Sequence, residues 1–156
     1  MAAEVGGPAP DFTLAGSDNT DAGRRDYWLA EYRGQVVVLV FYPGDSTPVC
    51  TRQLNSYTED IDSFTEAGAQ VLAISPQSVQ SHDDFSCKQG GFAFPLLADT
   101  DKAVGEAYGI LGPLGFYRRS AFVVDAAGVV RYAHRAVAGL TFRSTDELVS
   151  AVKAAS

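Results

Sequence analysis

The sequence has few cysteines, no long apolar run and no excess of positive charge. Its 156 residues include two cysteines, one methionine and one tryptophan. Two cysteines are too few for the disulfide framework that staples small secreted domains. No apolar run approaches the roughly 18 residues that a membrane-spanning helix needs. With 12 basic and 19 acidic residues, the formal net charge of −7 argues against a nucleic-acid partner.

The rest of the composition is that of an ordinary globular protein, 46% hydrophobic and 20% charged. A chain of this length can bury a core of its own, so we expect one domain over residues 1–156. Residues 1–10 are small and rich in proline and glycine, and we expect this N-terminal segment to be mobile. The segment has neither the basic start nor the apolar centre of a secretory signal, so a cytoplasmic protein is expected.

Predicted strands alternate with predicted helices along the chain. The strands are expected at residues 11–14, 35–41, 71–74, 94–97, 121–124 and 129–132. The helices are expected at residues 48–67, 78–89, about 101–108 and 144–153, with a helical turn within 24–32 that turns Trp28, Leu29 and Tyr32 toward the core. Ser144 and Glu147 form a capping box for the last helix. This order of elements predicts an α/β fold with a mixed sheet flanked by helices.

The segment from Tyr42 to Thr51 joins a buried strand to the first long helix. Thr47 is a natural N-cap and Pro48 suits the first helical position, so Cys50 falls in the first turn. A thiol there faces unpaired N–H groups and the positive end of the helix dipole, which both favour the nucleophilic thiolate. Most free cysteines are small buried apolar residues, but this position makes Cys50 a candidate reactive thiol.

A family resemblance starts from the same segment. Pro43, Thr47 and Cys50 resemble the peroxiredoxin active-site motif, and the flanking sequence resembles the peroxiredoxin Q, or bacterioferritin comigratory protein, group. The other matching segments are Ala9–Leu14, Ser81–His82 with Phe85 and Lys88, Phe94–Asp99, Tyr108–Gly109 and Arg119–Asp125. The resemblance spans nearly the whole chain and implies a thioredoxin-like fold of the peroxiredoxin type. It also implies a thiol-dependent peroxidase for hydrogen peroxide and small organic hydroperoxides.

This activity assigns a role to each residue of the motif. The Cys50 thiolate would attack the peroxide, whose oxygens need hydrogen-bond donors and a nearby cation. The donors are expected to be the Thr47 hydroxyl and the backbone N–H groups of Val49 and Cys50. Pro43, with Pro48, would stiffen the loop and shield the thiolate from bulk water.

Arg119 is expected to supply the cation. The family pattern has an arginine three residues before the strand phenylalanine, which here is Phe122. Arg118 is a direct competitor. Alternation along a strand would send the two side chains to opposite faces, so only one of them can reach Cys50.

The resemblance also gives Cys87 the resolving role, as in the subgroup with a distant second cysteine. Cys87 lies in the last turn of its predicted helix, where the negative end of the dipole disfavours a thiolate. Thioredoxin or a similar dithiol would then reduce the Cys50–Cys87 disulfide. The chain departs from the usual pattern at three positions: Val49 replaces Gly, Gln53 replaces Glu, and Asn55 stands where many members have their second cysteine.

Other readings stay open. An external thiol could resolve Cys50, which would make the protein a one-cysteine peroxidase. A non-catalytic thioredoxin-fold binding module or holdase would leave both cysteines incidental, and a thioredoxin-type dithiol oxidoreductase is weakened because no cysteine lies three residues from Cys50. No spacing of His and Cys resembles a zinc-ligand pair, so neither metal nor cofactor is expected. We expect a monomer or a weak homodimer that does not bind membranes.

Overall fold

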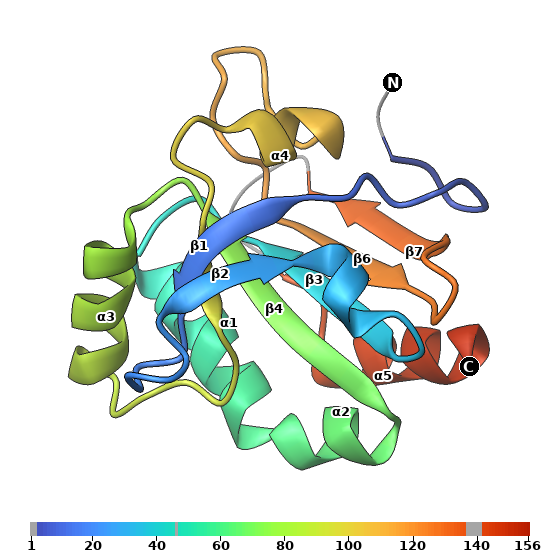
Figure 1. Cartoon of the computed structure of the whole chain (residues 1–156), viewed down its shortest axis with the longest axis horizontal. Coiled ribbons are helices and arrows are strands. Elements are labelled where there is room, and N and C mark those ends of the chain that lie inside the picture. Colours follow the sequence, from blue (N-terminus) through green and yellow to red (C-terminus); the bar gives the residue numbers. More distant parts are fainter. Residues whose placement is uncertain (1–2, 46, 137–141) are drawn as a thin grey trace.

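A seven-stranded mixed sheet forms the centre of the molecule in the computed structural model, which describes residues 3–45, 47–136 and 142–156 (Figure 1). The strands lie in the order β2-β1-β5-β4-β3-β6-β7. Their bounds are β1 Thr13–Ser17, β2 Arg25–Trp28, β3 Val36–Phe41, β4 Ala69–Ser75, β5 Leu96–Ala98, β6 Ser120–Val124 and β7 Val130–Arg135. β3, β4 and β5 run parallel, whereas β6 pairs antiparallel with β3 and β1 antiparallel with β5. The predicted mixed α/β architecture is confirmed.

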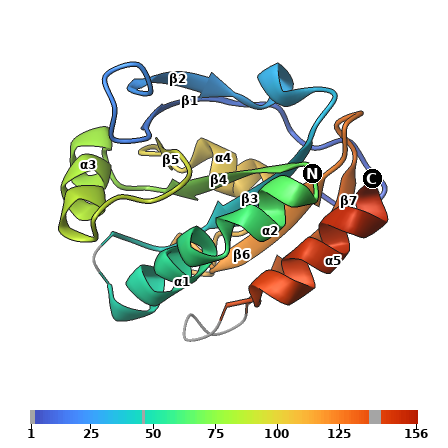
Figure 2. The same cartoon turned by 90° about the horizontal axis from the view of Figure 1, so that it is seen from below.

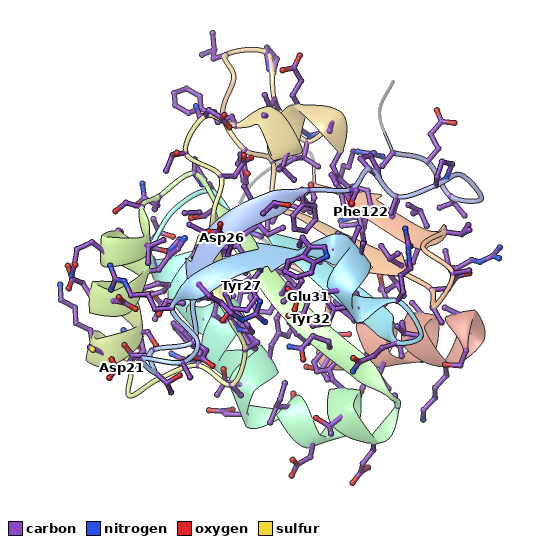
Figure 3. All side chains as sticks on the ribbon, in the orientation of Figure 1. Asp21, Asp26, Tyr27, Glu31, Tyr32 and Phe122 are labelled. Atoms are coloured by element: carbon purple, nitrogen blue, oxygen red, sulfur yellow. The ribbon has the colours of Figure 1, made fainter. Side chains whose placement is uncertain are left out.

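Helices cover both faces of the sheet, and β3 at its centre is therefore buried along its whole length. The helix bounds are α1 Pro48–Glu59, α2 Ile61–Glu66, α3 Val79–Lys88, α4 Ala103–Ala107 and α5 Thr145–Ala155, with a 3-10 helix η1 at Leu29–Tyr32. Val38 and Val40 pack in one core with residues of α1, α2 and α5, which lie on the same side of the sheet (Figure 2). Leu39 and Phe41 pack in the other core, together with Phe122 (Figure 3). Within the described ranges, no helix has both the length and the apolar character to cross a membrane.

The predicted helix over residues 48–67 is two helices, so that prediction is wrong at its middle. Asp60 separates α1 from α2, with a backbone conformation (φ −99°, ψ 17°) outside the helical region. The Thr145 hydroxyl, at the start of α5, donates a hydrogen bond of 2.9 Å to the Asp60 carboxylate. The start of α5 therefore contacts the chain at the residue where α1 ends and α2 begins. Gly68, with φ 81°, follows α2 as predicted.

The predicted helical turn within residues 24–32 is present as η1, but strand β2, which was not predicted, precedes it. Alternation along β2 buries Tyr27, which is 2% exposed, and leaves Trp28 45% exposed. The expectation that Trp28 faces the core is therefore wrong, whereas Leu29 is buried as expected. The strand period of two residues, and not a helical period, decides which side chains point inward.

Backbone hydrogen bonds join the described part of the N-terminal segment, residues 3–10, to the start of β7, and the mobility of the segment stays a prediction. The Gly6 N–H donates to Val130 O at 2.7 Å, and the Val130 N–H donates to Gly7 O at 2.9 Å. The Ala9 N–H donates to Gly128 O at 2.9 Å, and the Ala9 side chain is buried. Small residues let this segment approach the open edge of β7 closely, so backbone bonds that the composition did not reveal join it to that edge.

The cap of α5 offers a test of the fold. The Ser144 hydroxyl accepts a hydrogen bond from the Glu147 N–H at 3.2 Å, as the capping box predicts. Ser144→Ala should therefore lower the free energy of unfolding by about 1 kcal/mol. Urea denaturation would measure the change. Ser150→Ala, on the exposed surface of the same helix, is the control and should not destabilise the protein, because alanine is the better helix former. Equal midpoints for Ser144→Ala and wild type would contradict the capping role.

Candidate active site

Cys50 lies where the sequence predicts, in the first turn of the helix that follows the central strand. β3 ends at Phe41, and α1 begins at Pro48 with Thr47 as its extended N-cap residue. The Cys50 side chain is fully buried, in the core formed by α1, α2 and α5 on the sheet. The thiol is therefore shielded from bulk water. This shielding strengthens the electrostatic interaction between the sulfur and any charged group that faces it.

Arg119 reaches Cys50 through both terminal nitrogens of its guanidinium group. Nη1 lies 3.2 Å and Nη2 3.3 Å from Cys50 Sγ, and Arg119 is only 4% exposed. Arg119 directly precedes β6, and the register pairs Ser120 with Phe41 at the end of β3. The pairing brings the arginine beside the loop that leads to Cys50. A buried cation in contact with sulfur favours the thiolate over the thiol.

Arg118 points elsewhere, as strand alternation predicts. Its Nε donates to Ala136 O at 2.9 Å and its Nη2 to Arg135 O at 3.3 Å. Both acceptors are backbone carbonyls at the end of β7. Of the two arginines, Arg119 is the one that contacts Cys50, and its role toward a peroxide stays a prediction.

Gln53, which the sequence marked as a departure from the family pattern, is part of the site through a contact with Arg119 that was not predicted. It is 1% exposed, and its Oε1 accepts a 2.6 Å hydrogen bond from Arg119 Nη1. Its Nε2 lies 3.5 Å from the Tyr57 hydroxyl, which donates to Arg143 O at 2.5 Å. Burial raises the pKa of Tyr57 to about 12, so this phenol stays neutral. The spacing of three residues from Cys50 on one helix could have revealed this contact, because such residues share a helix face.

The remaining residues of the motif are less tightly held. Thr47 occupies the N-cap position, but its side chain makes no capping hydrogen bond, which corrects that part of the prediction. Its hydroxyl lies 3.4 Å from Gly44 O and is exposed to solvent. Pro43 and Val49 are half-buried on either side of it in sequence. The roles of Pro43, Thr47 and Val49 toward a peroxide stay predictions.

A buried polar cluster fixes the active-site loop to α3, and the sequence reasoning missed it too. The Asp45 carboxylate accepts hydrogen bonds from the Tyr42 hydroxyl at 2.7 Å, Ser81 Oγ at 2.6 Å and His82 Nδ1 at 2.8 Å. Burial alone would raise the pKa of Asp45, but these bonds and the charge of His82 outweigh it and lower that pKa. The sequence predicted His82 on the packed face of its helix, where it is indeed fully buried. The sequence could not show that Asp45 is the partner of His82, because only the tertiary fold brings the two residues together.

Cys87 lies in the last turn of α3, as predicted, but away from Cys50. Both cysteines are free thiols, one buried and one exposed. Cys87 Sγ contacts Asn19 Oδ1 at 3.6 Å. Beyond α3 the chain runs beside α1, where Asn55 Nδ2 donates to Gln89 Oε1 at 3.0 Å. Asn55 lies about 7.5 Å from Cys50 along the axis of α1, because five residues separate them. Since the chain after Cys87 contacts α1 at Asn55, Cys87 has to move toward the start of α1 before it can react with Cys50.

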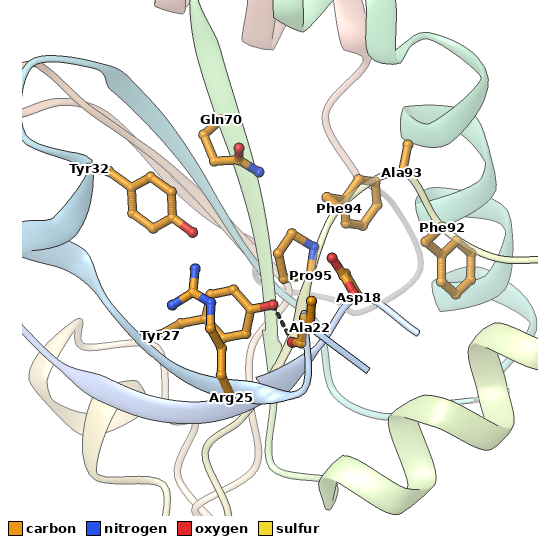
Figure 4. A pocket seen from close by; sticks show the side chains of 11 residues that line it. Asp18, Ala22, Arg25, Tyr27, Tyr32, Gln70, Phe92, Ala93, Phe94 and Pro95 are labelled. Atoms are coloured by element: carbon orange, nitrogen blue, oxygen red, sulfur yellow. Dashed lines mark hydrogen bonds between the residues drawn. The ribbon is translucent and has the colours of Figure 1, made fainter. Parts of the chain in front are cut away.

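A separate cavity of about 560 Å³ lies outside this site (Figure 4). Tyr27, Tyr32 and Gln70 line it, together with Arg25 and the chain before β5. Its polar groups are already engaged: the Tyr27 hydroxyl donates to Gly23 O, and Arg25 forms an ion pair with Glu31. We assign no chemistry to this cavity.

The geometry of the two arginines generates a prediction. Arg119→Ala in a Cys87→Ser background should slow the reaction of Cys50 with peroxide by roughly 10²-fold or more, since a cation in contact with the sulfur is lost. Stopped-flow peroxide consumption measures the effect. Arg118→Ala is the control and should stay within a few-fold of the parent. The reverse ranking of the two variants would contradict the assignment.

Known proteins match this sequence over most of the chain. The AhpC/TSA family matches residues 5–133. Peroxiredoxin-2 of Rattus norvegicus is 38% identical over 136 residues, which cover 83% of this chain and 68% of that protein. A putative peroxiredoxin of Mycobacterium tuberculosis is 39% identical over 132 residues, 80% of each chain. "Thioredoxin peroxidase" of Echinococcus granulosus is 38% identical over 138 residues, 84% of this chain and 70% of that protein.

Solved structures agree with the sequence relatives. Xanthomonas campestris peroxiredoxin Q superposes with a TM-score of 0.80 at 35% identity, covering 92% of this chain and 90% of that chain. The reduced 2-Cys peroxiredoxin of Plasmodium vivax superposes with a TM-score of 0.88 at 26% identity, covering 96% and 80%. These neighbours have the thioredoxin-like fold that the resemblance implied. With the buried arginine on a helix-start cysteine, these matches show that the chain belongs to the AhpC/TSA family of peroxiredoxins.

Proposed function

We propose that this protein is a thiol-dependent peroxidase in which Cys50 reduces the peroxide and Cys87 resolves the product. The observation that carries the proposal is the contact of Cys50 Sγ with both guanidinium nitrogens of Arg119, at 3.2 and 3.3 Å inside the core. A buried cation on a cysteine has a direct chemical use when that cysteine reacts as a thiolate. A non-catalytic binding module whose cysteines are incidental would have no chemical use for a buried arginine in contact with Cys50.

The proposed reaction follows from this geometry. The Cys50 thiolate attacks one peroxide oxygen, the O–O bond breaks, and the other oxygen leaves as an alkoxide or hydroxide that takes up a proton. Cys50 becomes a sulfenic acid, and Arg119 stabilises the charge that develops on the oxygens. The thiol of Cys87 then attacks the sulfenic sulfur, which forms a disulfide and releases water. Two electrons have then passed from the two thiols to the peroxide.

The proposed substrates are hydrogen peroxide and small organic hydroperoxides. A structure of the Xanthomonas campestris bacterioferritin comigratory protein, 35% identical to this chain, is titled for its alkyl peroxide reduction activity. The proposed reductant is thioredoxin or a similar dithiol, because the Echinococcus granulosus relative is named thioredoxin peroxidase. Exposed Cys87 would present the disulfide to such a partner. We further propose a cytoplasmic protein that is a monomer or a weak homodimer.

The position of Cys87 favours one alternative, a peroxidase resolved by an external thiol. In this reduced structure its sulfur contacts Asn19 and not Cys50. Intramolecular resolution therefore requires the end of α3, the first turn of α1, or both, to unwind before a disulfide forms. Helix ends open at low free-energy cost, and Gly90 and Gly91, both with positive φ, follow α3 directly.

The peroxidase activity is tested by removing the attacking thiol. Cys50→Ser should abolish peroxide consumption, because a serine hydroxyl stays protonated where the thiol ionises. Stopped-flow measurement of hydrogen peroxide consumption with reduced protein would show this. Cys87→Ser is the matched control and should keep the first turnover at the wild-type rate. Wild type and Cys50→Ser consuming peroxide equally fast would refute the proposal.

The resolving role of Cys87 has its own test. One equivalent of peroxide should link Cys50 and Cys87 within a single chain, because these are the only two thiols of the sequence. Peptide mapping of the oxidised monomer without reductant would find the linked pair. A persistent sulfenic or sulfinic acid on Cys50 beside a free Cys87 would instead support resolution by an external thiol.

A further inference from the structure

We propose that His82 is a positioning residue for the peroxide step: paired with Asp45, it holds the active-site loop against the first turn of α3. This proposal rests on the proposed peroxidase function. His82 contacts neither Cys50 nor Arg119 in any interaction described for it. Its effect on Cys50 passes through the loop that ends at the N-cap of α1.

Both nitrogens of the His82 ring face oxygen atoms. Nδ1 faces the Asp45 carboxylate at 2.8 Å, and Nε2 faces the backbone oxygen of Leu97 at 2.9 Å. A backbone carbonyl is an acceptor only, so Nε2 donates to Leu97. The pair is buried, with side-chain exposures of 0% for His82 and 3% for Asp45. Other groups facing the pair are the hydroxyls of Tyr42 and Ser81.

The pair joins the three elements that meet at the active-site loop. Asp45 lies in the loop itself, two residues before Thr47. Tyr42, which donates to it, continues from β3 and is buried in the same core as Cys50. His82 adds α3 and, through Leu97, strand β5. The loop is thus held by α3 on one side and by β3 on the other, so the opening of α1 has a fixed place.

The position of the pair along α3 also limits how far that helix can unwind. The Ser78 side chain caps the helix by accepting from the Ser81 N–H at 3.1 Å, and His82 anchors the first turn. Cys87 lies more than one turn later, near the end that Gly90 and Gly91 follow. The second half of α3 can therefore open to bring Cys87 toward Cys50 while the first turn keeps the loop in place. The resolving step does not need the pair.

The test separates the two chemical steps. In the double variant Asp45→Asn/His82→Gln both partners are replaced together by neutral amides, so no buried carboxylate is left without its partner. We expect the peroxide step to slow by about tenfold or more, because misplacing the attacking sulfur is costly. Formation of the Cys50–Cys87 disulfide from the sulfenic acid should not slow. Stopped-flow kinetics with peroxide, followed by timed acid quenching and peptide mapping, resolves both rates.

A milder variant keeps the proposal testable should the double variant fail to fold. Ser81→Ala removes one hydrogen bond to Asp45 and should slow the peroxide step by roughly two- to fivefold. Gln80→Ala, the exposed neighbour in the same turn, bonds to Asp84 and not to the loop, so it should match wild type. A peroxide step within twofold of wild type in the folded double variant, or in Ser81→Ala if the double variant does not fold, overturns the proposal. A parallel loss in both steps also overturns it, because a merely structural role predicts that result.

Hydrogen exchange gives an independent readout of the anchored turn. In oxidised wild type the amides of residues 82 and 83 should stay protected while those of 85–91 exchange faster than in the reduced protein. In the oxidised double variant all of them should exchange fast. Loss of protection at 82 and 83 in oxidised wild type would contradict the anchor, although the peroxidase could still be active. Failure of wild type to consume peroxide would instead refute the proposed function, and the positioning role with it.

Discussion

The contact between Arg119 and Cys50 is the constraint on which the rest of the site depends. It requires the pairing of β3 with β6 in one register, since Phe41 opposite Ser120 brings Arg119 to the loop. A slip by one residue would exchange the faces of the strand and turn Arg119 away. It also requires α1 to begin at Pro48, so that Cys50 points back toward the sheet. The contact between these two side chains thus depends both on a sheet register and on a helix start.

Two sets of polar contacts support this pair from different directions. Gln53 and Tyr57 connect the guanidinium group to α1 and, through Arg143 O, to the chain that enters α5. On the other side, Asp45 and His82 connect the loop to α3 and β5. Buried polar groups of this kind are costly unless they are paired, and here each one contributes to the position of another. These bonds join the elements around the site to one another.

The parts of this structure that local rules govern could be predicted from the sequence. The start of α1 at Pro48 follows from a proline at the first helical position, which puts Cys50 in the first turn. The contact of Arg119 rather than Arg118 with Cys50 follows from strand alternation together with the family pattern. Contacts between distant segments could not be predicted in the same way. Asp45 and His82 are 37 residues apart, and their pairing exists only once α3 lies beside the loop. The break at Asp60 involves Thr145, and the backbone bonds of residues 3–10 go to the edge of β7, so neither was visible locally.

The hydrogen bond between Asn55 and Gln89 bears on how Cys87 approaches Cys50. Asn55 lies five residues after Cys50 on α1, and Gln89 lies two residues after Cys87 at the end of α3. This bond therefore joins the helix that carries one thiol to the end of the helix that carries the other. Movement of the end of α3 toward Cys50 has to rearrange or break it, at a net cost of about 1 kcal/mol. The link between α1 and α3 is thus part of the free energy that separates the two thiols.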